Sequence, residues 1–197
     1  MNEDLCASAL TRAFLDARTY YRFTDRPVED GLLQRLYENV RWGPTALNCQ
    51  PARLIFIKSP EAKARLCSVL SPGNVGKVSS APVTAVVAWD TEFFTELPTL
   101  FPNRPSAKDA FAADHELARM TAIRNGTLQG GYLIVAARLL GLDVGPMSGF
   151  DEKMLNAEFF PDSRWRVNFL ANLGYGEPDA THPRGPRLAF EETCRIA

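Results

Sequence analysis

The chain has 197 residues, of which 46% are hydrophobic, 10% aromatic and 23% charged. These values match a soluble domain with a full core, exclude disordered and fibrous proteins, and predict a single domain over residues 1–197. With 22 Lys and Arg against 23 Asp and Glu, the net charge is −1. Such a balance provides no strong positive field for a polyanion or an anionic membrane. We therefore expect neither nucleic acid nor a membrane as a partner.

The N-terminal residues lack the basic and apolar regions of a signal peptide, and no apolar run reaches the roughly 18 residues of a membrane helix. We therefore expect a cytoplasmic protein. Its 4 cysteines form no C-x-x-C pair, which predicts reduced thiols rather than a redox or zinc motif. The 2 histidines, His115 and His182, are too few for a multi-histidine metal site. We expect no metal.

The first half of the chain alternates helical and strand patterns. Apolar positions spaced by three and four residues predict amphipathic helices, and short apolar runs predict buried strands. The expected elements are helices over 4–18, 32–40 and 61–70, loops over 42–51 and 71–76, and strands over 54–57 and 83–89.

The second half begins with residues 90–114, which show no clear period and predict an excursion or a lid with one short helix. A long apolar helix over 117–140 should be central and buried, with Gly141 as its stop. A turn-rich loop over 145–151 then leads to a helix over 152–158, for which Asp151 is a suitable N-cap. A strand over 166–173 and an irregular tail follow. This order predicts an α+β domain with helices on both faces of a sheet.

Two nucleotide-binding motifs are absent. Gly76-Lys77 resembles part of a phosphate loop, but Ser71 and Val78 stand where that motif requires Gly and Ser or Thr. Gly174-Tyr-Gly176 has no third glycine and no following βα unit, so it is not a dinucleotide fingerprint.

Four short segments remain: Arg18-Thr19, residues 43–51 (GPTALNCQP), residues 145–151 (GPMSGFD) and residues 184–188 (RGPRL). In this order and spacing the set resembles the nitroreductase family of FMN-dependent NAD(P)H oxidoreductases, over about residues 15–195. Residues 81–90, 146–151 and 186–192 resemble the branch that contains malonic semialdehyde reductase.

The resemblance implies a nitroreductase-like three-layer fold, with a central mixed sheet covered by helices, and an intertwined homodimer with FMN at the subunit interface. NADPH or NADH would donate hydride to flavin N5 in a ping-pong cycle, and a small-molecule acceptor would then take it. No catalytic side chain is required, because the flavin carries the chemistry. The acceptor is open between malonic semialdehyde, which would give 3-hydroxypropionate, and nitro or quinone compounds. A flavin-binding protein without nicotinamide turnover is a further alternative.

By the same resemblance, Arg18, Arg184 and Arg187 contact the phosphate and ribityl chain. Cations suit a phosphate, although arginines of this kind are also common on protein surfaces. The hydroxyl and amide contacts to the ribityl hydroxyls and the pyrimidine edge would come from Thr19, Thr45, Asn48 and Gln50. Ala46, in the same loop, is also expected to contact the cofactor. Alternatively, Thr and Asn in such loops bond their own backbone.

The loop with Pro146, Met147, Ser148 and Gly149 would meet the N5 and O4 edge of the flavin through the backbone N–H groups of Ser148 and Gly149. Gly149 permits a close approach because it has no Cβ. The alternative is an ordinary turn that Asp151 caps.

The first motif departs from the family, because Ala17 and Tyr21 stand where many members carry basic residues. A carboxylate substrate would require a cation, for which Arg104 and Arg124 are candidates. Outside the resemblance, Cys49 is a candidate nucleophile if its thiol pKa is lowered.

Overall fold

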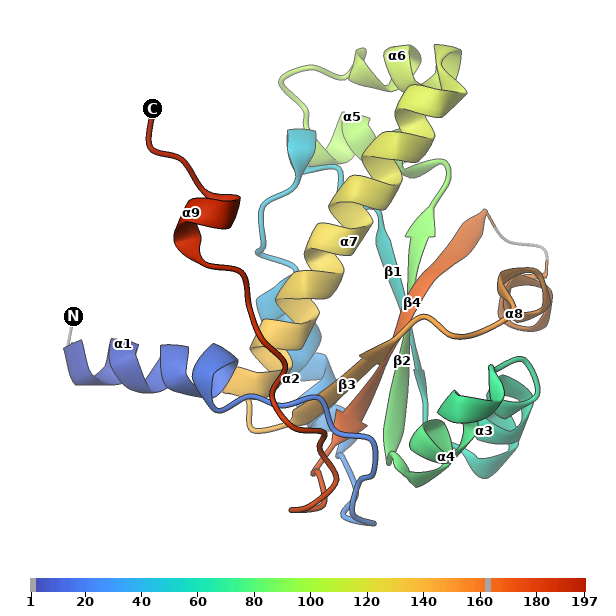
Figure 1. The fold of residues 1–197 in the computed structure, drawn as a ribbon. Helices are drawn as coiled ribbons and strands as arrows, with labels where there is room; N and C mark the ends of the chain where they lie inside the picture. Colours follow the sequence, from blue (N-terminus) through green and yellow to red (C-terminus); the bar gives the residue numbers. More distant parts are fainter. Residues whose placement is uncertain (1–2, 162–163) are drawn as a thin grey trace.

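The computed structural model describes residues 3–161 and 164–197, and its centre is a sheet of four strands (Figure 1). The strands are β1 (Ala52–Ile57), β2 (Val83–Asp90), β3 (Asp143–Met147) and β4 (Trp165–Gly174), in the order β1-β2-β4-β3. Each neighbouring pair is antiparallel. The expected mixed sheet is therefore antiparallel, and the parallel pairing in the described residues is one isolated bridge between Thr19 and Val144.

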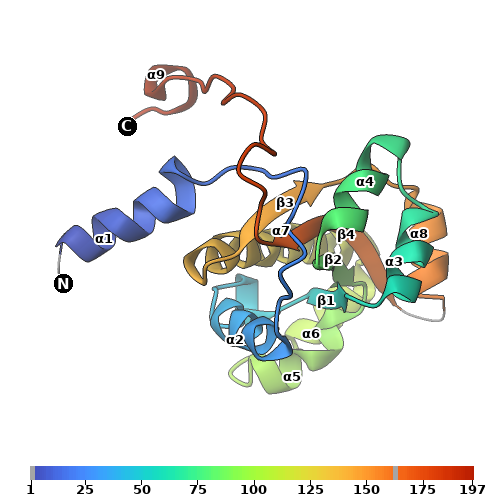
Figure 2. The same ribbon diagram turned by 90° about the horizontal axis from the view of Figure 1, so that it is seen from below.

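Helices cover both faces of this sheet, as predicted. The helices α2 (Asp30–Val40) and α7 (His115–Leu139) lie on one face, and α3 (Pro60–Cys67), α4 (Pro72–Ser80) and α8 (Glu152–Phe159) lie on the other (Figure 2). Successive residues of the central strand β2 serve the two layers in turn, since side chains alternate along a strand. Val87 packs in the α2 and α7 core, whereas Val86 packs against α3, α4 and α8.

Local signals in the sequence account for several helix ends. Asp151 Oδ1 accepts a hydrogen bond from Met154 N at 2.9 Å, which confirms it as the N-cap of α8. Asp114 caps α7 in the same way through Leu117 N at 2.9 Å. Gly141, at φ 95°, lies just beyond the end of α7 in the left-handed region that favours glycine. None of the helices in the described residues is both long and apolar enough to cross a membrane.

Two loop predictions were wrong. Residues 71–76 belong largely to α4, which begins at Pro72. A proline is compatible with the first helical turn, because the N–H that it lacks would have no partner within the helix there. The loop predicted at 145–151 begins inside β3, which pairs with β4 from Asp143 to Met147. Because β3 is an outer strand, it tolerates Pro146. Gly145 is required there, since a Cβ would lie 2.6 Å from the carbonyl oxygen of Tyr20.

The excursion over residues 90–114 is more ordered than predicted. It contains η3 (Phe93–Glu96), α5 (Leu97–Leu100) and α6 (Ala107–Ala113) in place of one short helix. Phe93, Leu97 and Phe111 are buried and form a separate core with the N-terminal half of α7. The aromatic side chains of this segment therefore pack, and their irregular spacing reflects three short helices in succession.

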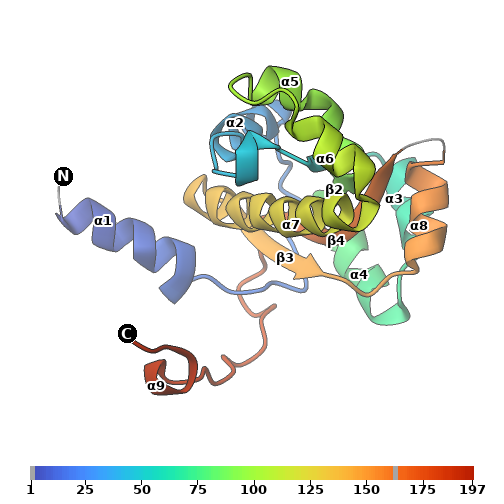
Figure 3. The ribbon, with the colours of Figure 1, turned by 90° about the horizontal axis from the view of Figure 1, so that it is seen from above.

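The N-terminal helix differs from the prediction in length and in packing. The α-helix α1 (Glu3–Leu10) continues as the π-helical segment η1 (Thr11–Leu15), and Ala13 is the buried residue of η1. Leu5 and Leu10 are 69% and 60% exposed, so their apolar stripe is not covered by this chain. The C-terminal segment with α9 (Phe190–Thr193) projects on the same side of the body, and Phe190 is likewise exposed (Figure 3).

Candidate functional site

Three of the predicted arginines lie around one cavity of about 500 Å³, which Arg18, Thr19, Arg184 and Arg187 help to line. Arg18 donates to the carbonyl oxygen of His182, and Arg184 Nη2 donates to the carbonyl oxygen of Leu15 at 2.5 Å. These bonds fasten the C-terminal segment to the end of η1. Arg187 bonds only its neighbours in the described chain, through the carbonyl oxygens of Gly185 and Pro186.

The lining of this cavity is strongly cationic. Arg138, near the end of α7, also contributes to it, and none of the described residues that line it is acidic. Each guanidinium has five N–H donors, so the carbonyl bonds above do not exhaust them. Four guanidinium groups without a carboxylate favour a dianion such as a phosphate monoester.

The edge of β3 places the predicted 146–149 loop next to the Arg18 segment. Thr19 pairs with Val144, while Pro146 and Met147 complete the strand. Beyond it, Ser148 is exposed. The carbonyl oxygen of Gly149 accepts bonds from Asn74 Nδ2 and Ser71 N, both at 3.0 Å.

Asn74 and Lys77 of α4 are polar neighbours of this loop that the sequence prediction missed. Lys77 Nζ donates to Asn74 Oδ1 at 3.0 Å. A Cβ at Gly149 would lie 2.5 Å from Asn74 Nδ2, so a larger residue there would displace the Asn74 side chain. Residues 71–76 were predicted to form a loop. In the helix that they begin, Asn74 and Lys77 are three residues apart and therefore lie on one face.

The predicted loop with Thr45, Ala46, Asn48 and Gln50 is held by α7. Ala46 N donates to Asn125 Oδ1 at 2.8 Å, and Ala52 N donates to Gln129 Oε1 at 2.9 Å. These acceptors are one turn apart on α7 and are buried, a pattern that was visible as two polar positions in an apolar helix. Between them the backbone enters the left-handed region at Leu47 (φ 53°), Asn48 (φ 52°) and Gln50 (φ 38°). Such strained positions cluster at functional sites.

The polar side chains of this loop bond one another and the α5 segment. Thr45 Oγ1 accepts from Gln50 N at 3.2 Å, Asn48 Nδ2 donates to the carbonyl oxygen of Leu100 at 3.0 Å, and Gln50 Nε2 donates to Asn48 Oδ1 at 2.9 Å. Within one chain the local alternative fits Thr45, whereas Asn48 bonds the backbone of α5 instead of its own loop. Their role toward a cofactor stays a prediction.

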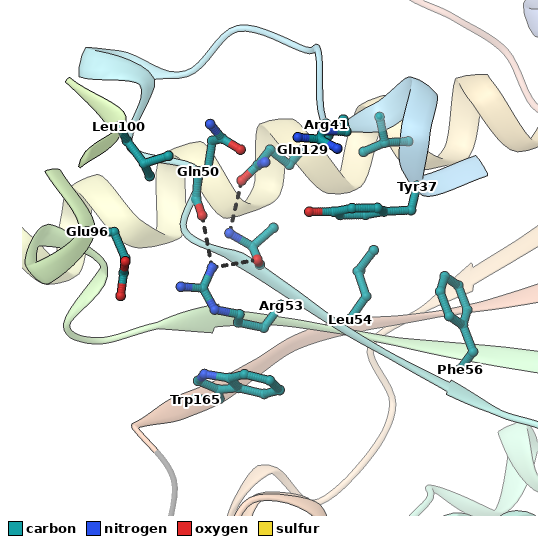
Figure 4. Close-up of a pocket in the computed structure, with 12 residues that line it drawn as sticks. Tyr37, Arg41, Gln50, Arg53, Leu54, Phe56, Glu96, Leu100, Gln129 and Trp165 are labelled. Carbon is teal, nitrogen blue, oxygen red and sulfur yellow. Dashed lines mark hydrogen bonds between the residues drawn. The ribbon is translucent and has the colours of Figure 1, made fainter. Parts of the chain in front are cut away.

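A second cavity, of about 540 Å³, opens beside this loop (Figure 4). Tyr37 and Arg41 line one side of it, and Glu96 and Leu100 line the other. Arg53 is held at its floor, because Nη1 donates to the carbonyl oxygen of Gln50 at 2.9 Å and Nη2 pairs with buried Asp90 at 2.7 Å. The cavity thus offers cationic, acidic and aromatic groups together.

Neither arginine predicted for a carboxylate substrate lines this cavity. Arg104 is exposed between α5 and α6, and Arg124 is exposed on α7, where it borders an apolar groove with Leu128 and Tyr132. The cations that do line the cavity are Arg41 and Arg53.

One chain does not bring all the predicted site residues together. The arginine cavity reaches Arg138, whereas the 45–50 loop is held at Asn125. Those positions are about 20 Å apart along α7, at about 1.5 Å per residue. The two groups also flank opposite outer strands, β3 and β1.

Cys49 has the environment of an inert thiol. Its side chain is 1% exposed, and burial raises its pKa to about 11. The thiol is therefore protonated at neutral pH and is a poor nucleophile. We expect Cys49→Ala to retain full activity, and native Cys49 to resist thiol reagents at pH 8. Loss of activity in that variant, with an unchanged fold, would contradict this expectation.

The family model described as "Nitroreductase family" matches residues 15–175. The chain belongs to the nitroreductase family. The family that the four motifs predicted is thus confirmed, and with it the class of enzyme, an oxidoreductase.

Relatives of this nitroreductase-family chain extend over its full length. A Rhodopseudomonas palustris protein is 52% identical over 196 residues and covers 100% of both chains, and one from Ralstonia nicotianae is 51% identical over 189 residues and covers 96% of both. Their names begin "Putative NADH dehydrogenase/NAD(P)H nitroreductase".

Solved structures share the fold. A nitroreductase family protein from Streptococcus pneumoniae has a TM-score of 0.81 at 21% identity, covering 98% of this chain and 100% of that one. A structure from Exiguobacterium sibiricum in complex with FMN has a TM-score of 0.85 at 17% identity, covering 95% of this chain and 97% of that one. These likenesses confirm the nitroreductase-like three-layer fold.

Proposed function

We propose that this chain is an FMN-dependent NAD(P)H oxidoreductase that reduces a small-molecule acceptor. The observation that carries the proposal is the cationic cavity, where Arg18, Arg184 and Arg187 would hold the phosphate and where no acidic side chain lines the described wall. When bound, FMN supplies hydride transfer between NADPH or NADH and the acceptor. Membership of the family and the names of the relatives support this assignment.

The chain's own residues would bind and orient the cofactor. Thr19 adjoins the arginines, and the 146–149 segment, with its glycine at the close approach, would support the ring. Lys77 lies next to this segment through Asn74. A cation at that position would stabilise the extra negative charge of a reduced ring.

The proposal is tested by the visible absorbance spectrum of the purified protein, before and after anaerobic addition of NADPH and then NADH. We expect a yellow protein that bleaches with at least one nucleotide. A yellow protein that never bleaches would instead indicate flavin binding without nicotinamide turnover. A colourless protein that takes up no added FMN would refute the proposal.

For the acceptor we propose malonic semialdehyde, which would be reduced to 3-hydroxypropionate. Residues 81–90, 146–151 and 186–192 support this choice by their resemblance to that branch. The competing class is a broad nitro or quinone reductase. Steady-state rates on the semialdehyde, a nitroaromatic and a quinone, at one donor concentration, separate the two. Turnover of the nitroaromatic and quinone alone would exclude the semialdehyde.

We also propose a homodimer in which the second copy completes the site. The support is the separation of the arginine cavity from the 45–50 loop, together with the uncovered apolar residues of α1 and the C-terminal segment. Exposed apolar patches of this kind mark interaction surfaces.

The molecular mass measured by analytical ultracentrifugation should therefore be twice the 21.8 kDa of one chain. Leu5→Glu with Leu10→Glu is expected to shift the protein toward the monomer, because burying two carboxylates opposes association. Met154→Glu is the matched control, since Met154 is 53% exposed on α8, away from α1. An unchanged dimer in the double variant would argue against α1 as part of the interface.

A further inference from the structure

Arg138 has a buried hydrogen-bond donor that nothing in the described chain satisfies. Its Nη1 donates to the carbonyl oxygen of Ala13 at 3.1 Å, but its Nε is buried without a partner. A buried donor left without an acceptor is costly, and more so on a charged group. The chain therefore leaves the donors of this guanidinium partly unused, and a ligand would meet Arg138 where it lines the arginine cavity.

Arg138 lies between a cavity without acidic residues and one of mixed charge. It lines the arginine cavity and a smaller one of about 130 Å³, where Arg12, Asp16, Arg18 and Asp143 are the other charged groups. Burial lowers the pKa of Arg138, while Asp143 opposes the shift. Asp143 itself accepts a bond from Gly176 N at 2.8 Å, and none of the ion pairs in the described residues includes Arg138.

The neighbouring residues of the first motif do not supply this charge. Ala17 lines both cavities with a methyl side chain. Tyr21 is directed to the C-terminal segment, where its hydroxyl donates to the carbonyl oxygen of Asp179 at 3.3 Å and its ring lies 4.8 Å from that of His182. The guanidinium of Arg138 is thus the cation that α7 presents beside Arg18.

We infer that Arg138 binds the phosphate of the flavin cofactor and supplies there the positive charge that Ala17 and Tyr21 lack. This inference rests on the proposed function. Arg138 also ties η1 to α7, because Arg12 Nε donates to its carbonyl oxygen at 2.6 Å. Binding of the phosphate would thus be coupled to the position of η1.

The test compares FMN with riboflavin, which has the same ring and no phosphate, in fluorescence titrations of the apoprotein. Arg138→Gln should raise the Kd for FMN by about 10- to 100-fold, the loss of a charge-assisted hydrogen bond, and leave the Kd for riboflavin unchanged. Arg138→Lys, which retains the charge, should keep most of the FMN affinity. Arg124→Gln, an exposed arginine of the same helix, is the control and should bind FMN as the wild type does.

The outcomes distinguish a failure of the proposed function from a failure of the inference about Arg138. Wild-type protein that binds neither flavin overturns the proposed function and this inference with it. Wild-type protein that binds FMN, with an Arg138→Gln variant that binds it equally well, overturns the inference alone. Equal loss of FMN and riboflavin affinity would show that Arg138 only holds η1 in place. Should the Gln variant fail to fold, Arg138→Met, which also removes the charge, takes its place, and an unchanged FMN affinity or an equal loss of both affinities there overturns the inference.

Discussion

Replacing Arg18 and Arg187 together by alanine is expected to weaken FMN binding by about 100-fold or more. Each arginine would lose charge-assisted contacts to the phosphate, which are worth about 1.5–3 kcal/mol, and about 1.4 kcal/mol corresponds to a factor of ten. Both residues line the same cavity, from chain segments that lie far apart in the sequence. Fluorescence titration of the apoprotein with FMN measures the effect.

The control for this double variant must separate binding from folding. Arg18 also fastens the C-terminal segment through the carbonyl oxygen of His182. Arg187→Ala alone avoids that problem, because Arg187 bonds only the carbonyl oxygens of its neighbours in the described chain. Arg104→Ala with Arg124→Ala removes the same charge from exposed positions elsewhere. If the Arg18 and Arg187 double variant bound FMN as tightly as the wild type, the arginine cavity would be excluded as the phosphate site.

Asp90→Asn is expected to destabilise the protein by about 3 kcal/mol, the lower end of the range for breaking a buried ion pair. The Asp90 carboxylate is fully buried; Arg53 Nη2 lies 2.7 Å from Oδ2, and Arg164 Nε lies 2.8 Å from Oδ1. In the variant, an amide N–H would face an arginine donor. The value is at the lower end because Arg53 and Arg164 are 22% and 33% exposed and can recover some hydration.

Chemical denaturation of the apoprotein measures this change, with Asp30→Asn as the control. Asp30 pairs with Lys58, but its side chain is 79% exposed, so its loss should cost at most about 1 kcal/mol. Equal destabilisation by the two substitutions would mean that the Asp90 pairs contribute no more than a surface pair. A loosened Arg53 should also disturb Gln50, whose carbonyl oxygen it binds.

Strong local patterns allowed much of the fold to be predicted. The helix α7, the central strand β2 and the Asp151 cap of α8 follow from periodicity and capping chemistry over a few residues. The strand β3 could not be found in the same way, because Gly145 and Pro146 resemble a turn. Its pairing with β4 and the close carbonyl oxygen of Tyr20 are tertiary contacts.

The candidate site was predicted in part and for a similar reason. The motifs identified Arg18, Arg184 and Arg187, which the structure places around one cavity. Arg138 was not predicted as a site residue, because its position beside the cavity depends on the contact between the end of α7 and η1. Lys77 was considered only as part of a phosphate loop and not as a neighbour of the 146–149 segment, because glycines made the first turns of α4 resemble a loop.

By itself the sequence determined the layers of this protein, its long central helix and its family, because each of these follows from local spacing or from short motifs in order. Only the tertiary structure decided the antiparallel direction of the strands, the exposure of α1 and the separation of the arginine cavity from the 45–50 loop. These properties depend on contacts between residues that are distant along the chain. An apolar stripe such as that of Leu5 and Leu10 predicts that a surface is to be covered, but the pattern does not specify whether the same chain covers it.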